Sequence, residues 1–276
     1  MNGRFPKPAR LLLGFIVIYC CQAATAQGPL AINVAPTRVT FDKSSLSSTV
    51  TIVNRGLEPV RYRLNLCDME MAEDGTLTRK LEPTRNSAQS YIRFAPREVA
   101  LGPGEIQKVR ILATIPACLP KGEYRSHLAF EPISTGEAVS PSLVKGGGAP
   151  GKLKLQMRMR AAVTIPIFLR NGDLSGKGSV SDIAIVEGKM VRVTLSREGD
   201  RTVRGNCLVK FIPAGGKTAV LLAKGQDVPV YFPNQARSIL FGMEKPIAGF
   251  GAGSLEVSFF EPGGPVSTKV VPVSGS

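Results

Sequence analysis

The sequence predicts an all-β protein of two immunoglobulin-like β-sandwich domains in tandem, preceded by a cleaved signal peptide. Short runs rich in β-branched and aromatic residues alternate with Gly, Pro, Asn and Asp along the chain, as strands alternate with turns. No convincing helical spacing of apolar residues appears. The mature chain of about 250 residues also exceeds the usual length of one domain, which favours two domains.

Residues 1–26 have the composition of a secretory signal peptide. Three basic residues precede an apolar run from Leu11 to Cys21, and an Ala-Thr-Ala motif then ends at Ala26, where we expect cleavage. The run is shorter than the roughly 20 apolar residues that a membrane-spanning helix requires. A lipoprotein signal that uses Cys20 or Cys21 is the alternative. We therefore expect an exported protein without stable membrane insertion.

The N-terminal immunoglobulin-like domain is expected to cover residues 27–170. Seven antiparallel strands separated by short turns are typical of this sandwich. The expected strands are Thr37–Phe41, Thr49–Asn54, Val60–Met69, Tyr91–Val99, Ile106–Ile115, Glu123–Glu131 and Leu153–Leu169.

A C-terminal β-sandwich domain is expected over residues 174–276, because the polar segment Arg-Asn-Gly-Asp at 170–173 interrupts the strand pattern. The expected strands here are Val180–Val186, Met190–Ser196, Asn206–Ile212, Ala219–Leu222, Val228–Phe232, Ser238–Phe241 and Leu255–Phe260.

The segment from Lys152 to Phe168, KLKLQMRMRAAVTIPIF, alternates apolar and other residues for longer than the five or six residues of an average strand. In a β-strand this spacing places all the odd-numbered side chains on one face. That apolar row consists of Leu153, Leu155, Met157, Met159, Ala161, Val163, Ile165 and Ile167. A Gly-rich segment at 132–151 precedes it and is expected to be a flexible connection.

The chemistry of an enzyme is missing from the sequence. The single histidine, His127, lies in an expected strand, and no nucleophile motif of the G-x-S-x-G type is present. No cluster of His and Cys has metal-ligand spacing, and no Gly-rich segment has the phosphate-loop signature. We therefore expect a binding protein that uses neither a cofactor nor a metal.

Charge and cysteine content limit the partners and the compartment. The formal net charge is +14, but Trp is absent and aromatic residues are not interleaved with the basic ones, which argues against nucleic acid. Three cysteines follow the signal segment, and an odd number in an oxidising compartment suggests one pair and one free thiol. Because Cys67 and Cys118 are expected at the same end of the first sandwich, they are the candidate disulfide, and Cys207 is expected to be a buried, inert thiol.

Three stretches together resemble the PapD-like periplasmic chaperones of pilus assembly, as a divergent branch of that family. They are APTRVTF at 35–41 with TVTIVNRG at 49–56, YIRFAPREVALGPGEIQKVRI at 91–111, and the alternating strand that ends in IPIFLR. The resemblance implies a periplasmic, L-shaped chaperone that stabilises pilus or fimbrial subunits by donor-strand complementation and delivers them for surface assembly. The subunits are then the main partners, and an outer-membrane usher is a further candidate.

The resemblance also implies roles for individual residues. The eight apolar residues of the alternating row would form the donor strand. Arg38 matches the family arginine that binds the terminal carboxylate of the subunit, whereas Thr164 stands where the family has a lysine. Arg160 is a candidate for the missing second cation. Pro166 is a second departure, since proline belongs at a sheet edge or a bulge.

Other interpretations stay open. In a structural or adhesive envelope protein without chaperone activity, the alternating strand would only cover the core of its own domain. A membrane-inserting hairpin has support in the alternation alone, because the sequence offers only one such strand.

Overall fold

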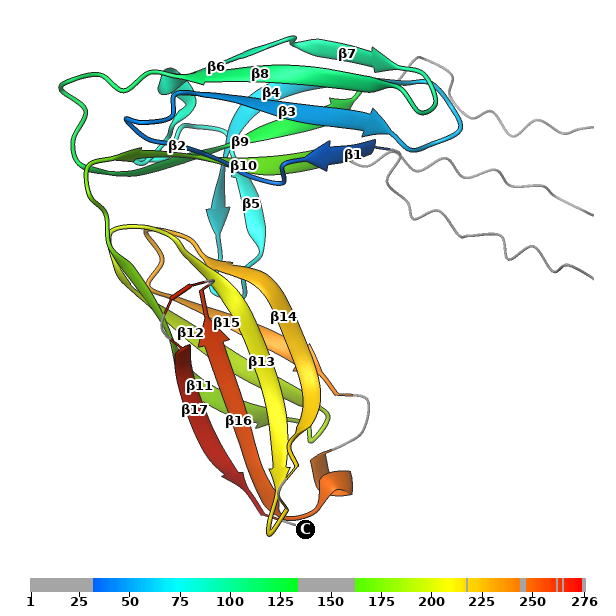
Figure 1. Ribbon diagram of the computed structural model, residues 1–276, viewed down its shortest axis with the longest axis vertical. Coiled ribbons are helices and arrows are strands. Elements are labelled where there is room, and N and C mark those ends of the chain that lie inside the picture. Colours follow the sequence, from blue (N-terminus) through cyan, green and yellow to red (C-terminus); the bar gives the residue numbers. More distant parts are fainter. Residues whose placement is uncertain are drawn as a thin grey trace, which may run out of the picture.

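The computed structural model describes residues 32–133, 162–216, 218–243, 247–261, 263–264 and 266–274, and these residues are almost entirely β (Figure 1). Two short 3-10 turns, η1 (Gln89–Tyr91) and η2 (Ile247–Phe250), interrupt the strands. The described residues include no helix that is long and apolar enough to cross a bilayer. The expected all-β class is confirmed, and the signal peptide lies outside the described residues.

The first sandwich has the strand order of a constant-type immunoglobulin domain. Its smaller sheet runs in the order β1 (Ile32–Ala35), β3 (Ser47–Asn54), β8 (Ile106–Ala113) and β6 (Ile92–Ala95). Its larger sheet runs in the order β2 (Val39–Phe41), β10 (Val163–Asn171), β9 (Gly122–Pro132), β4 (Val60–Met71) and β5 (Leu77–Lys80), and β7 (Glu98–Leu101) also pairs with β4. The strands β1, β3, β8 and β6 thus correspond to the first, second, fifth and fourth strands of an immunoglobulin domain. The strands β4, β9 and β10 correspond to its third, sixth and seventh strands.

Two segments of this domain change from one sheet to the other at a proline. The chain passes from β1 to β2 around Pro36, and from β6 to β7 around Pro96. Proline has no N–H for the ladder, and at these two positions the strand changes its partner. The expected continuous strand Tyr91–Val99 is therefore wrong, and the separate strands β1 and β5 were not anticipated.

The core of the first sandwich lies between its two sheets. Every second residue of β3 and β8 points into this core, for example Val50, Ile52 and Ile111. Leu64 of β4 and Phe130 of β9 fill it from the other sheet. Each of these side chains is fully buried, and burial of a side chain of this size stabilises the fold by about 1.5–3 kcal/mol. The period of two that predicted the strands is thus the period of the core.

The second sandwich has its own core and two smaller sheets. One sheet has the order β11 (Gly176–Val186), β12 (Met190–Gly199) and β15 (Ala236–Gly242). The other has the order β14 (Val220–Val230), β13 (Val203–Pro213), β16 (Gly253–Phe260) and β17 (Val266–Val273). The core residues between them include Val193, Leu195, Val209, Phe211 and Val257.

Two expectations for the second domain are corrected. The segments Ala219–Leu222 and Val228–Phe232 were expected as two strands, but both lie mainly in the single strand β14. The residues between them do not end the strand, because β14 keeps its pairing with β13 and only shifts its register there. The last strand, β17, was not expected. Its exposed positions carry Val266 and Val270, so it lacks the clean apolar alternation that identifies a strand with one buried face.

The two sandwiches meet at an angle and give the molecule an L shape (Figure 1). The hairpin of β4 and β5 extends from the first sandwich toward the second. Its connection places the carbonyl of Glu73 within 2.7 Å of the backbone nitrogen of Ser238 in β15. Domain orientation is therefore set by direct contacts as well as by the short covalent connection between β10 and β11.

Shortening Ile167 to alanine tests its position in the core of the first sandwich. Ile167 is fully buried, so we expect Ile167→Ala to lower the free energy of unfolding by about 2–5 kcal/mol in urea denaturation. Thr164→Ala, three residues earlier and exposed, should change it by less than about 0.5 kcal/mol. Equal effects of the two substitutions would contradict this assignment.

Candidate functional site

Within the described part of the chain, half of β10 is an open sheet edge. β10 pairs with β9 from Val163 to Asn171, but on its other side β2 pairs only with Ile167–Leu169. Among the described residues, Val163–Pro166 therefore have a strand partner on one side only. An unpaired edge offers backbone N–H and C=O groups to a strand of another chain. Pro166 lies in this half, in keeping with the preference of proline for edges.

The eight residues of the apolar row divide into two groups. Ile165 and Ile167 belong to the core of the first sandwich, and Val163 packs against that core while partly exposed. These three side chains therefore contribute to their own domain. The expected donor residues Leu153, Leu155, Met157, Met159 and Ala161, together with Arg160, lie outside the described residues.

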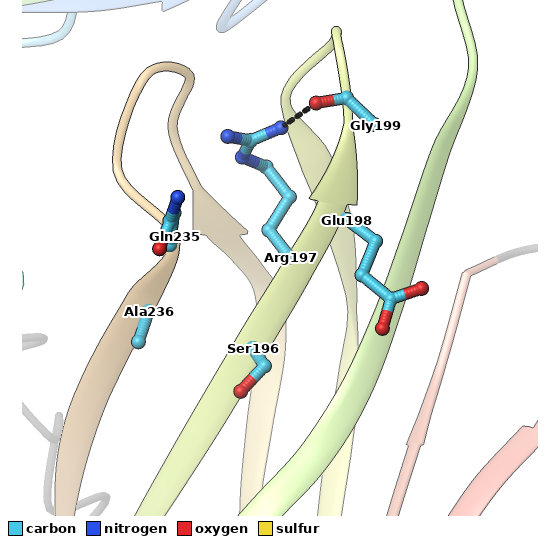
Figure 2. Close-up of a pocket in the computed structure, with 6 residues that line it drawn as sticks. All are labelled: Ser196, Arg197, Glu198, Gly199, Gln235 and Ala236. Atoms are coloured by element: carbon cyan, nitrogen blue, oxygen red, sulfur yellow. Dashed lines mark hydrogen bonds between the residues drawn. The ribbon is translucent and has the colours of Figure 1, made fainter.

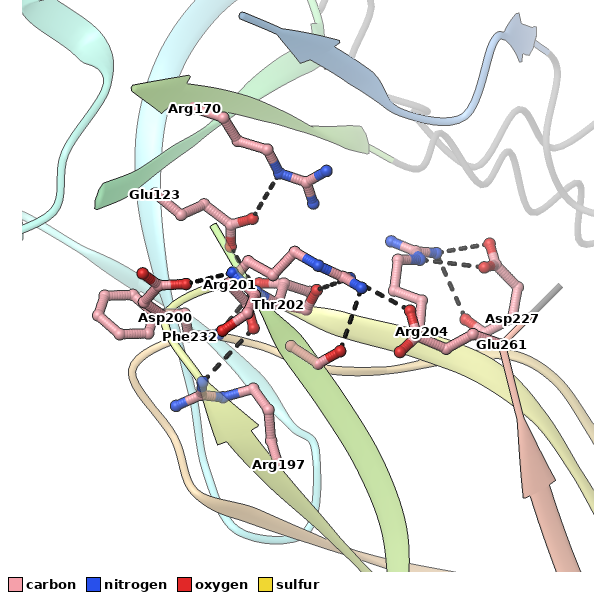
Figure 3. A network of polar contacts seen from close by, with 12 residues as sticks. Glu123, Arg170, Arg197, Asp200, Arg201, Thr202, Arg204, Asp227, Phe232 and Glu261 are labelled. Atoms are coloured by element: carbon pink, nitrogen blue, oxygen red, sulfur yellow. Dashed lines mark hydrogen bonds and ion pairs between the residues drawn. The ribbon is translucent and has the colours of Figure 1, made fainter. Parts of the chain in front are cut away.

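Arg38 lies in the connection between β1 and β2 and faces the second domain. Its Nη1 donates to both carboxylate oxygens of Asp227 in β14, each at 2.8 Å. Arg204 in β13 holds the same carboxylate, with Nε at 3.0 Å from Oδ1 and Nη2 at 2.5 Å from Oδ2 (Figure 3). Thr164 is exposed, pairs with Ala129 in the ladder, and takes no part in this group. The structure thus brings together Arg38 with two residues that the sequence analysis did not select.

A buried carboxylate joins the two domains close to this group. Glu123 at the start of β9 is 3% exposed. One of its oxygens accepts a hydrogen bond from Nε of Arg170 at 3.0 Å, and the other accepts one from the backbone N–H of Thr202 in the second domain at 2.9 Å (Figure 3). Because the Arg170 side chain is 31% exposed, loss of this pair should cost less than the roughly 3–5 kcal/mol of a fully buried pair.

A second contact region lies along the outer face of β9 and the hairpin of β4 and β5. Arg125 donates to the carbonyl of Met69 at 2.9 Å, and its guanidinium lies 4.1 Å from the ring centre of Tyr231 in the second domain. Asn234 donates to the carbonyl of Met71 at 2.7 Å. Met71, Phe168 and Tyr231 form a small apolar cluster beneath these polar contacts.

The turn of the β4–β5 hairpin requires glycine at position 75. Its φ angle is +89°, a left-handed conformation that side chains disfavour, and an added Cβ would lie 2.2 Å from Nε of Arg237 in the second domain. The positive φ therefore favours glycine here, and a side chain at this position would also require the Arg237 side chain to move.

His127 is a buried strand residue in β9, as the sequence suggested. It is 1% exposed, and its ring meets that of Tyr231 edge to face at 6.4 Å between centres. Burial, reinforced by the charge of Arg125, lowers the pKa of His127 to about 3, so the imidazole is neutral at physiological pH. No group of three or more His, Cys, Asp or Glu side chains that could hold a metal ion occurs in the described part of the chain.

The expected disulfide between Cys67 and Cys118 is not formed, and both thiols are free. The physical reason is the length of β4, which continues to Met71, so that Cys67 lies within the strand and not at its end. Cys67 pairs with His127, five residues into β9, or about 16 Å from the end where the Cys118 loop enters. A disulfide needs Cα atoms within about 7 Å of each other.

Cys207 matches its expected character. It is fully buried in the second core, and burial raises the pKa of its thiol to about 11. A thiol in this state is a poor nucleophile at neutral pH.

A hollow of about 520 Å³ on the second domain offers little chemistry (Figure 2). It is lined by Ser196, Arg197, Glu198, Gly199, Gln235 and Ala236. The guanidinium of Arg197 donates to the carbonyls of Gly199 at 2.7 Å and Asn234 at 2.8 Å, which fix the neighbouring turns. The lining has no histidine, cysteine or lysine.

The chain is similar in overall structure to solved fimbrial chaperones. A chain of the CsuC–CsuE chaperone–tip subunit complex of Acinetobacter baumannii matches with 11% identity and a TM-score of 0.45, over 88% of this chain and 98% of that one. The class 5 fimbriae chaperone CfaA matches with 12% identity and a TM-score of 0.43, over 87% and 98%. The CupB2 chaperone of Pseudomonas aeruginosa matches with 14% identity and a TM-score of 0.41, over 87% and 100%. No protein-family model and no curated protein sequence matches the chain.

The buried His127 should make folding sensitive to pH. Its unfolded pKa is near 6.5 and its folded pKa is about 3, so below 6.5 the unfolded chain binds a proton that the folded chain does not. The free energy of unfolding should therefore fall as the pH drops, by about 2 kcal/mol between about pH 7 and about pH 5. His127→Gln removes the titrating group, and urea denaturation across this range should then show a smaller fall.

Neighbouring charges do not produce the same effect in this pH range. Arg125 stays charged throughout it. Although burial raises the pKa of Asp68, hydrogen bonds from Ser126 and Thr84 hold that pKa below its usual value. If the free energy of unfolding of His127→Gln falls with pH as much as that of the wild type, another group is responsible for the pH dependence.

Proposed function

We propose that this protein is a periplasmic chaperone that binds and stabilises pilus or fimbrial-type subunits by donor-strand complementation and delivers them for surface assembly. The observation that carries the proposal is the open edge of β10 at Val163–Pro166, which directly continues the apolar row from Leu153 to Ala161. A subunit with an incomplete sandwich could pair its backbone with this edge and its extension. The apolar side chains would fill the groove of the subunit.

The free energy gained by burying the donor side chains can be compared with the cost of association. Burying Leu153, Leu155, Met157 and Met159 would contribute about 6–12 kcal/mol at about 1.5–3 kcal/mol each. Association costs of about 4–15 kcal/mol oppose this gain. Because the two ranges overlap, apolar burial is comparable in size to the cost of association, and backbone pairing with the subunit would add to it.

Polar groups would add orientation and selectivity. Arg38 would bind the terminal carboxylate of the subunit, since a guanidinium can hold a carboxylate through two hydrogen bonds. The net positive charge of the chain would favour approach of acidic subunits. The even positions of the donor segment, Lys152, Lys154, Arg158 and Arg160, place part of this charge beside the apolar row.

The proposal includes the cellular context and the domain limits. A signal peptide at residues 1–26 would direct the chain to the periplasm, where an outer-membrane usher would receive the loaded chaperone. Residues 27–170 and 174–276 would be the two domains. The function requires no catalytic step, no cofactor and no metal.

The alternative is a structural or adhesive envelope protein in which the whole apolar row serves its own domain. The burial of Ile165 and Ile167 in the first core fits this alternative equally well, so it does not separate the two functions. The difference lies in residues 153–159. Protection of that segment from proteolysis in the isolated protein would favour the structural role, and protection only in the presence of a subunit would favour the chaperone.

Charge introduced into the donor segment tests the proposal. The protein is co-expressed with pilin-like subunits encoded beside it, and the amount of soluble subunit in the periplasm is measured. We expect Met157→Asp combined with Met159→Asp to reduce soluble subunit at least about tenfold, because two charges would have to enter an apolar groove.

The matched control carries the same charge change away from the donor segment. Leu57 and Leu81 are 83% and 98% exposed, so Leu57→Asp combined with Leu81→Asp should leave the subunit yield unchanged. If the donor-segment variant keeps the subunit as soluble and as abundant as the control variant does, donor-strand complementation is wrong.

A further inference from the structure

Two arginines from different domains hold one carboxylate at the domain junction. Arg38 belongs to the first sandwich, whereas Arg204 and Asp227 lie on the paired strands β13 and β14 of the second. Four hydrogen bonds of 2.5–3.0 Å join the two guanidinium groups to the two oxygens of Asp227. The junction therefore already has the geometry that binds a carboxylate.

Asp227 does not fully satisfy the two arginines. Two positive charges face one negative charge, and the Nη1 of Arg204 is buried without a hydrogen-bond acceptor. Although burial raises the pKa of Asp227, Arg204 and Arg38 hold it below its usual value, so the carboxylate is ionised. The group as a whole keeps a net positive charge that favours a further anion.

The bridge to Arg38 is accessible to solvent. The side chains of Arg38 and Asp227 are 45% and 48% exposed. Ion pairs this exposed contribute little net stability and are screened by salt. An incoming carboxylate can therefore reach Arg38 and replace Asp227 at a modest cost.

The backbone presents Asp227 to Arg38 in an unusual conformation. Its φ angle is +50°, in the left-handed region that few non-glycine residues adopt. Its N–H donates to Oδ1 of Asn206 at 3.1 Å, beside the register shift between Gly205 and Cys207. The irregularity in the β13–β14 pairing thus places an acidic side chain where a regular strand would not.

We infer that Arg38 and Arg204 form a two-domain binding site for a carboxylate group, which Asp227 fills in the free protein and which the terminal carboxylate of a bound subunit takes over. The identity of that carboxylate rests on the function proposed above. Arg204 then supplies the second cation, in a region where Thr164 cannot. Displacement of Asp227 also breaks the contact between Arg38 and the second domain, while the contacts through Glu123 and the β4–β5 hairpin remain.

The test measures carboxylate binding directly. N-acetyl-phenylalanine, which has the end group of a protein chain, is titrated into the full mature protein, and the Nε–H signals of Arg38 and Arg204 are followed by NMR. We expect Asp227→Asn to bind this probe about tenfold more tightly than the wild type, because the internal competitor is gone. N-acetyl-phenylalaninamide, which lacks the charge, should bind neither protein.

Two further variants complete the design. Glu70→Gln removes another exposed, ion-paired carboxylate and should leave the affinity for the probe at the wild-type value. Arg204→Gln, added to Asp227→Asn, should abolish the gain. Thermal unfolding of each variant checks folding, and Asp227→Ser replaces Asp227→Asn if the asparagine variant is unstable.

The inference is overturned if Asp227→Asn binds the probe no more tightly than the wild type, if the amide probe binds equally well, or if Arg204→Gln leaves the gain intact. Failure of the proposed function is a separate outcome. If the probe binds as expected but the protein stabilises no subunit in co-expression, the carboxylate site is supported and the chaperone function is contradicted. If the protein stabilises subunits but Asp227→Asn binds the probe no more tightly than the wild type, the chaperone function is supported and the carboxylate site is contradicted.

Discussion

The buried carboxylate of Glu123 is the interaction on which the geometry of the junction depends. It binds Arg170 of its own domain and the backbone of Thr202 in the other, and it is almost completely removed from water. A charge in that position is stable only when both partners are in place. It therefore fixes the start of β9, the end of β10 and the entry to β13 relative to one another. Arg38 and Asp227 can meet because that arrangement is fixed.

The β4–β5 hairpin restricts the same junction from a second direction. Its backbone bonds to Ser238, its glycine turn lies against Arg237, and Met71 packs between Phe168 and Tyr231. The apolar contact of Met71 with Phe168 and Tyr231 is buried, whereas the bridge from Arg38 is exposed. The junction thus combines a rigid side, made by the hairpin and Glu123, with a side that solvent and ligands can reach. A site on the accessible side can respond to a ligand without disturbing either core.

The sequence predicted the fold better than it predicted the site. Alternating apolar residues identify strands such as β3 and β8 because the same alternation builds the core. It could not identify β17, whose apolar residues are partly outward, or the sheet change at Pro96, which depends on tertiary pairing. The residues of the candidate site were predicted less completely than the strands. Arg38 was selected from the sequence, but Arg204 and Asp227 have no distinguishing sequence pattern, and Arg38 meets them only because the two domains pack together. The Cys67–Cys118 pairing failed because it assumed a shorter β4.

The distribution of free thiols has a practical consequence. Cys67 and Cys207 are buried, while Cys118 is exposed in the loop that leads to β9. That loop also carries Lys121, which pairs with Asp200 of the second domain at 3.6 Å. Among the described cysteines, a thiol-specific fluorophore would therefore label Cys118, beside the junction. The native sequence thus already provides an attachment site for an optical probe of the domain junction.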